Sequence, residues 1–139
     1  MNVDAALAYA PALLILAFPS NDVAAGVPAA DTVANMRRIA AHAARGPGRR
    51  AANLVLGTQP RAGLDATQRT ALAETDALAE GEFGPCFVPL REALSDPDGE
   101  PAATYAAGDG IHLNATGHAL ILARVNAALA SGRCVRLAP

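Results

Sequence analysis

The feature that most constrains the fold is the continuous apolar run ALLILAF, which follows Pro11 and ends at the polar sequence PSND. A strand with one face in water would alternate apolar and polar residues, and this run does not. It is also far too short to span a bilayer as a helix. We therefore expect residues 12–18 to form a strand that is buried on both faces, as in a parallel sheet covered by helices.

The rest of the chain alternates between helical and strand-like segments. Asp65 and Gln68 have the spacing of a capping box before an alanine-rich helix, and Asn114 or Thr116 is expected to cap the last helix. Helices are predicted over 2–9, 28–44, 65–81, 91–94 and 115–131, and strands over 12–18, 52–57 and 86–90. This order predicts one three-layer α/β/α domain, residues 1–139, with a parallel sheet that binds ligands at the carboxyl ends of its strands.

Composition and charge exclude several functional classes. With 52% hydrophobic and 17% charged residues, the chain can form a folded core. A net charge of −2 gives no electrostatic basis for binding nucleic acid or an acidic membrane surface. The arginine cluster RGPGRR, residues 45–50, is interpreted as a solvated loop. No Lys or Arg precedes the first apolar run, so a signal peptide is not predicted, and export would require a true N-terminus upstream.

The two cysteines, Cys86 and Cys134, are too few and too far apart for a zinc knuckle or a redox pair. Buried thiols are the preferred interpretation, and a single disulfide stays open for an exported protein. No glycine-rich phosphate loop and no metal-ligand spacing is present in the sequence. We therefore predict no metal and no cofactor.

Two short polar motifs carry the chemistry. In DGIHLNATGH, Asp109 stands three residues before His112, so the loop can fold the carboxylate onto one imidazole nitrogen and leave the other free to take a proton. In PSND, Asn21 follows the first predicted strand, where its amide could stabilise an oxyanion. Both motifs are expected at the same edge of the sheet. The sequence therefore predicts a base and an oxyanion donor in one cleft.

Together the two motifs resemble blocks of the SGNH (GDSL-like) hydrolases, in which a Gly-x-Asn-Asp block is followed by Asp-x-x-His before the C-terminal helix. The resemblance covers essentially all 139 residues. It implies a flavodoxin-like fold and hydrolysis of a small carboxylic ester. It also implies that His112 is the general base, that Asp109 orients the imidazole ring, that Asn21 is the oxyanion donor and that Asp22 supports its loop.

The chain departs from the family pattern in two places. Pro19 stands where the family usually has glycine, and the Gly-Asp-Ser block with the nucleophilic serine is absent. None of the serines, Ser20, Ser95 and Ser131, is predicted to replace it. The resemblance then implies a C-terminal portion of the domain whose first strands are missing. The strand over 12–18 becomes a sheet edge, through which we expect copies of the chain to associate.

Three hypotheses follow. The chain is the C-terminal part of a serine esterase whose nucleophile lies elsewhere, or a non-catalytic SGNH-like remnant that binds a ligand or partner, or an unrelated doubly wound fold. The first two place His112 and Asn21 in one cleft, and the third does not require it. The substrate's acyl and alcohol groups are not predicted, because the loops that select them vary freely on one scaffold.

Overall fold

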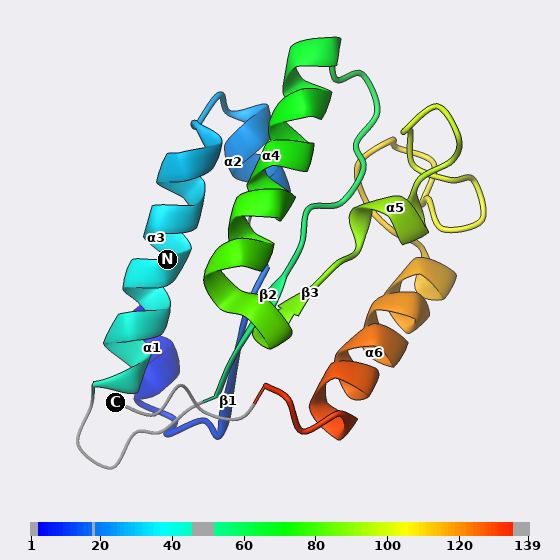
Figure 1. Cartoon of the computed structure of the whole chain (residues 1–139). Coiled ribbons are helices and arrows are strands. Elements are labelled where there is room, and N and C mark those ends of the chain that lie inside the picture. The colour runs from blue at the N-terminus through cyan, green and yellow to red at the C-terminus, as the bar shows by residue number, and fades with distance from the viewer. Residues whose placement is uncertain (1–2, 18, 46–51, 135–139) are drawn as a thin grey trace.

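The computed structural model describes residues 3–17, 19–45 and 52–134, which form a parallel sheet flanked by helices (Figure 1). The strands are β1 (Leu13–Leu16), β2 (Ala52–Leu56) and β3 (Phe87–Val88), in the order β1-β2-β3. In the register, Ile15 is opposite Leu54 and Val55 is opposite Phe87. The predicted α/β class with a parallel sheet is confirmed.

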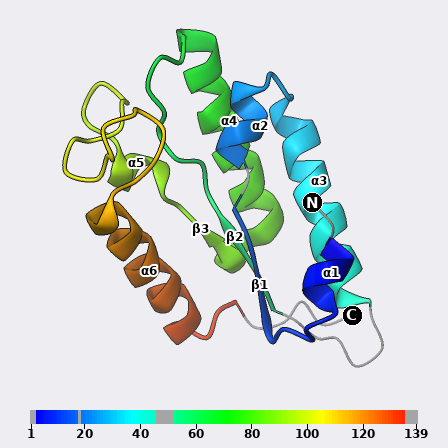
Figure 2. The same ribbon diagram turned by 180° about the vertical axis from the view of Figure 1, so that it is seen from behind.

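Helices cover both faces of this sheet. They are α1 (Val3–Leu7), α2 (Pro19–Ala24), α3 (Ala29–Ala44), α4 (Ala66–Phe83), α5 (Arg91–Leu94) and α6 (Ala115–Ala130), with a 3₁₀ turn, η1 (Gly84–Cys86), before β3. Figures 1 and 2 show α3 and α4 side by side on one face, with α6 on the other. None of the helices in the described ranges is long and apolar enough to cross a bilayer.

Successive residues of β2 divide the core into two layers. Val55 packs in one cluster with Met36 of α3 and Phe83 of α4. Leu54 and Leu56 belong to a second cluster, which includes Leu94 of α5 and Val125 of α6. Leu54 and Val55 are fully buried. Because successive side chains point to opposite faces, a strand must be apolar wherever helices cover both of its faces. This explains why Leu54, Val55 and Leu56 are all apolar, whereas Asn53 near the start of β2 is half-buried and donates to the Ala40 carbonyl at 3.3 Å.

Several elements differ from the prediction in extent. Residues 12–18 form a strand only over Leu13–Leu16, and Phe18 lies outside the described residues, as does most of the arginine cluster, residues 46–50. The segment PSND, expected as a loop, opens helix α2 instead. Proline suits the first helical position because the amide hydrogen it lacks would have no partner there. The helix therefore begins directly at Pro19.

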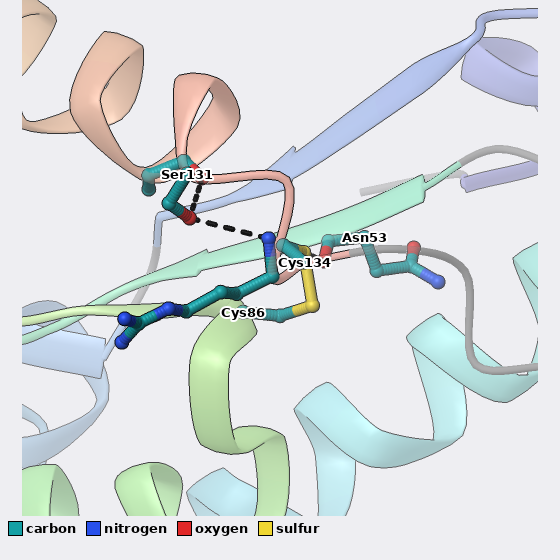
Figure 3. Close-up of a disulfide and its surroundings, with 6 residues drawn as sticks. Asn53, Cys86, Ser131 and Cys134 are labelled. Atoms are coloured by element: carbon teal, nitrogen blue, oxygen red, sulfur yellow. Dashed lines mark hydrogen bonds between the residues drawn. A yellow bond between two sulfur atoms is a disulfide. The ribbon is translucent and has the colours of Figure 1, made fainter.

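The cysteines correct the sequence interpretation. Buried thiols were preferred, but Cys86 and Cys134 form a disulfide with a Cα–Cα distance of 4.6 Å (Figure 3). The bond joins the segment after α6 to the turn before β3, and the Cys134 sulfur lies 3.3 Å from the carbonyl oxygen of Asn53 in β2. Next to it, the Ser131 hydroxyl donates to the Ala128 carbonyl at 2.7 Å. The segment after α6 is thus tied covalently to the turn that leads into β3.

Candidate active site

A cavity of about 140 Å³ opens where the carboxyl ends of β1 and β2 meet the loop before α6. This is the edge at which parallel α/β sheets bind ligands. The described residues that line it are Ala17, Pro19, Ser20, Asn21, Gly57, Gln59, Pro60, Arg61, Ile111 and His112. Asn21 and His112, which come from opposite ends of the chain, therefore face one cavity.

Asp109 and His112 are in contact in the loop before α6. His112 Nδ1 lies 2.6 Å from Asp109 Oδ2, and Asp109 Oδ1 accepts hydrogen bonds from the backbone N–H groups of Ile111 at 2.9 Å and His112 at 2.8 Å. These hydrogen bonds hold the pKa of Asp109 below its ordinary value, and the bond from the His112 ring has the largest effect. A carboxylate only accepts, so the neutral ring carries its proton on Nδ1 and leaves Nε2 as an acceptor.

The loop that carries this pair requires glycine at one position. Gly110 has φ +75°, and a Cβ there would lie 2.7 Å from the Cβ of Ala62 in the loop after β2. The Gly110 carbonyl accepts a hydrogen bond from the Ala62 N–H at 2.8 Å. A side chain would strain the backbone and push the two loops apart. The close approach fixes the His112 loop against the opposite wall of the cavity.

Asn114 anchors the other end of this loop and is the residue that caps α6. Its Oδ1 accepts from the Gly117 N–H at 3.0 Å, and its Nδ2 donates to the carbonyls of Thr104 at 2.9 Å and Ala106 at 3.1 Å. A cap of this kind contributes about 1 kcal/mol. Here it also ties the segment before the loop to the helix after it, which limits the movement of His112.

Asn21 lies in the first turn of α2 with its side chain exposed. Its Oδ1 accepts a hydrogen bond from Arg61 Nη1 at 3.4 Å. The side chain of Asp22 makes no hydrogen bond or ion pair with another described residue. Its carbonyl accepts from the Val27 N–H at 2.9 Å and closes the end of α2. The supporting role of the Asp22 carboxylate stays a prediction, as do the catalytic roles of Asn21, Asp109 and His112.

Ser20 lines the cavity, and its hydroxyl is held by backbone groups. Its Oγ accepts from the Gln59 N–H at 2.6 Å and donates to the Gln59 carbonyl at 3.2 Å. Ser95 and Ser131 donate to the carbonyls of Arg91 and Ala128. Ser20 therefore links α2 to the loop after β2, and its proton is already donated to a carbonyl.

Sequence reasoning missed the functional part of the loop after β2. Gln59 and Arg61 line the cavity, and the signal that could have found them is that the loop follows a buried parallel strand. Asp76 of α4 holds the start of this loop, because its Oδ1 accepts from the Thr58 N–H at 2.7 Å and its Oδ2 from the Thr58 hydroxyl at 2.8 Å. Burial raises the pKa of Asp76, and the bonds from Thr58 and from Arg91 at 3.0 Å oppose that shift.

Within the described ranges, no group of three or more His, Cys, Asp or Glu side chains is arranged to hold a metal ion. The chemistry that these side chains offer is that of an imidazole base with an oriented ring, near an amide and a guanidinium that can donate to an anion.

Comparison with known proteins identifies the family. The model of the GDSL-like lipase/acylhydrolase family matches residues 1–120. The chain belongs to this family. GDSL-like family membership supports an ester-type hydrolase. A solved structure of TesA superimposes with a TM-score of 0.65 at 24% identity, covering 91% of this chain and 67% of the TesA chain, which shows a shared fold. No curated protein matches the chain significantly.

Proposed function

We propose that this chain carries the general base and an oxyanion donor for hydrolysis of a small carboxylic ester. The observation that carries the proposal is that His112, bonded to Asp109, and Asn21 line one cavity at the carboxyl edge of the sheet. An oxyanion donor must share the reacting centre with the base, because both act on the same carbonyl group in the transition state.

The steps follow from the donors and acceptors of these side chains. His112 Nε2 accepts a proton from an attacking hydroxyl as its oxygen bonds to the ester carbonyl carbon. The carbonyl oxygen becomes an oxyanion, which the Asn21 Nδ2–H groups stabilise, while Asp109 stabilises the imidazolium. The carbonyl re-forms as the C–O bond to the leaving group breaks, the imidazolium gives its proton to the departing alkoxide, and an alcohol leaves. The acyl group stays on the attacking oxygen until a water, which gives a proton to His112, attacks it and releases the carboxylic acid. No cofactor takes part in this scheme.

The attacking hydroxyl is not assigned to any of the three serines of the chain. Ser20 comes nearest to the cavity, but its hydroxyl is held by Gln59. We therefore propose that the chain by itself does not turn over esters, and that an added alcohol can replace the nucleophile. Trifluoroethanol is suitable because it is small and ionises more easily than water.

The test is acetyl transfer from p-nitrophenyl acetate to trifluoroethanol. The rate is measured from the p-nitrophenolate that the transfer releases. Without the alcohol, the chain should be no faster than its His112→Ala variant. With it, wild type should accelerate transfer, and His112→Ala and Asn21→Ala should lose the acceleration. His118→Ala and Asn126→Ala are matched controls, because these exposed residues of α6 do not line the cavity. Equal transfer by wild type and His112→Ala would refute the proposal.

The alternative is a non-catalytic domain that binds a ligand at this cavity. The engagement of the Ser20 hydroxyl by Gln59 favours it, because Ser20 carries the one hydroxyl side chain among the described lining residues and that hydroxyl is already bound. It predicts that methyl acetate perturbs the NMR signals of the Asn21 and His112 side chains, whereas alcohol-dependent transfer is absent. Labelling of Ser20 by a fluorophosphonate probe would contradict both this alternative and the view that the chain lacks a nucleophile.

We also propose that copies of the chain associate through β1. Among the described strands β1 pairs only with β2, and Ile15 on it is 40% exposed. An apolar strand with unpaired N–H and C=O groups along one side is a template for another strand. The oligomeric state in solution tests this association.

A further inference from the structure

Arg61 brings an unneutralised positive charge to the cavity. Of the described lining residues, it is the one lysine or arginine, and none is Asp or Glu. Other half-buried arginines have carboxylate partners: Arg69 pairs with Glu100, and Arg91 with Asp76 at 3.0 Å. Arg61 has no such partner among the described residues. A guanidinium stays charged at all relevant pH values, so the cavity is electrostatically suited to an anion.

Most of the hydrogen-bonding capacity of Arg61 is unused. Its Nη1 donates to Asn21 Oδ1 at 3.4 Å, and no other described residue accepts from the guanidinium. A guanidinium has five N–H donors in a planar fork, which matches the two oxygens of a carboxylate. Because Arg61 can only donate, it must face the oxygen of the Asn21 amide. The Nδ2–H groups of Asn21 are thereby left for a second acceptor.

The backbone around Arg61 is held on two sides. Gln59 is bonded to the Ser20 hydroxyl at 2.6 Å, and the Ala62 N–H donates to the Gly110 carbonyl at 2.8 Å. The guanidinium is therefore carried by a loop fixed to both α2 and the His112 loop. Preorganised donors of this kind lose less entropy when a ligand binds than flexible surface side chains do.

We infer that Arg61 forms a carboxylate subsite, so that the ester bound beside His112 and Asn21 is one that also carries a carboxylate group. The inference rests on the proposed function for the position of the ester, and it goes further by naming the substrate class. The subsite contacts the substrate and takes no part in proton transfer. A cavity of about 140 Å³ suits a short half-ester of a dicarboxylic acid.

Two ligands of almost equal shape test the subsite: monomethyl succinate, which has an ester and a carboxylate, and dimethyl succinate, which is neutral. Their affinities are measured by NMR titration of wild type, Arg61→Gln and Arg61→Lys. Arg38→Gln is the matched control, because Arg38 also donates to an asparagine side chain, Asn35 at 3.0 Å, but both residues are exposed on α3 and do not line the cavity. The two Gln variants remove the same charge from different places.

Wild type and Arg38→Gln should bind the half-ester about tenfold more tightly than the diester, the low end for a hydrogen-bonded charge at a half-exposed site. Arg61→Gln should lose the preference while its affinity for the diester is unchanged. Arg61→Lys should keep part of the preference, because lysine retains the positive charge but lacks the planar pair of donors of a guanidinium. If Arg61 only shaped the cavity, both ligands would weaken together. Equal affinities in wild type, a preference that survives in Arg61→Gln, or no binding of either ligand would overturn the subsite.

The outcome does not depend on catalysis. A preference for the half-ester without alcohol-dependent transfer would retain the subsite and reject the proposed hydrolysis. Transfer that requires His112 and Asn21, together with equal affinity for the two succinates, would retain the proposed hydrolysis and reject the subsite.

Discussion

Breaking the Cys86–Cys134 disulfide should cost this chain a large part of its stability without changing a fully buried core residue. The bond closes a loop between residues 48 apart in sequence. In the chain-entropy treatment, a loop of this length restricts the unfolded ensemble enough to stabilise the fold by about 4 kcal/mol. At about 2.1 cal/mol/K of unfolding entropy per residue, that loss lowers Tm by about 14 °C for 139 residues.

The local structure says where the loss should appear first. Val125 is buried in the core, and Leu120, Ile121 and Ala128 pack against it half-buried, so no α6 residue after Val125 is fully buried. The disulfide holds the segment just after the helix. Asn114 caps the opposite end through bonds that do not involve the disulfide. Amide exchange in the reduced protein should therefore rise in the last turns of α6 before it rises near the cap.

The assay is urea unfolding of wild type with and without dithiothreitol, beside a Cys86→Ser/Cys134→Ser variant. Thiol titration should find no free thiol in the untreated protein. The double variant should match reduced wild type and should not respond to dithiothreitol, which separates the bond from other effects of the reductant. Free thiols in untreated protein, or a stability change below about 1 kcal/mol on reduction, would refute the reasoning, because a 48-residue loop cannot be that inconsequential in the chain-entropy treatment.

Three further outcomes are expected. Gly110→Ala should destabilise the fold by about 1–3 kcal/mol in urea unfolding, because alanine there combines a positive φ with a clash against Ala62. Gly108→Ala is the control, because Gly108 also has a positive φ but a Cβ there meets open space, and it should cost less. Equal costs would contradict the role of the clash. The hydrogen bond from His112 lowers the pKa of Asp109 in the folded protein. The ionised carboxylate therefore stabilises the fold fully at pH values above the ordinary carboxyl pKa, and this stabilisation is lost as the pH falls toward the lowered pKa. Asp109→Asn should abolish this acid dependence in amide-exchange measurements and slow alcohol-dependent transfer about 10²- to 10⁴-fold. An unchanged dependence of amide exchange on pH would show that the Asp109–His112 contact does not stabilise the loop. Ile15→Lys should shift the chain from oligomer toward monomer in size-exclusion chromatography with light scattering, and a wild-type monomer would remove the β1 association.

The local pattern of the sequence determined the elements whose stabilising contacts are close in sequence. The capping box of Asp65 and Gln68 forms at the start of α4, and Asn114 caps α6. The contact of Asp109 with His112 spans three residues, so the loop alone can bring the carboxylate to the ring. Continuous apolar runs likewise identified the strands of the parallel sheet. The expectation that the first strand is buried on both faces is wrong, because only Leu16 of β1 is buried and Ile15 is 40% exposed.

Only the tertiary structure decided which distant loops meet. Arg61 and Asn21 are 40 residues apart, and the disulfide joins residues 48 apart. The two cysteines suggested a possible disulfide but not that they lie close enough to form one, and no residue pattern suggested the Arg61–Asn21 contact. Residue spacing determines the geometry of one turn, whereas the distance between two loops depends on the strand order and the path of the chain. The same reason applies to the Ser20 hydroxyl, whose partner Gln59 follows a different strand. The sequence singled out His112 and Asn21, and the packing of the loop after β2 placed the Arg61 guanidinium in the cavity that both residues line.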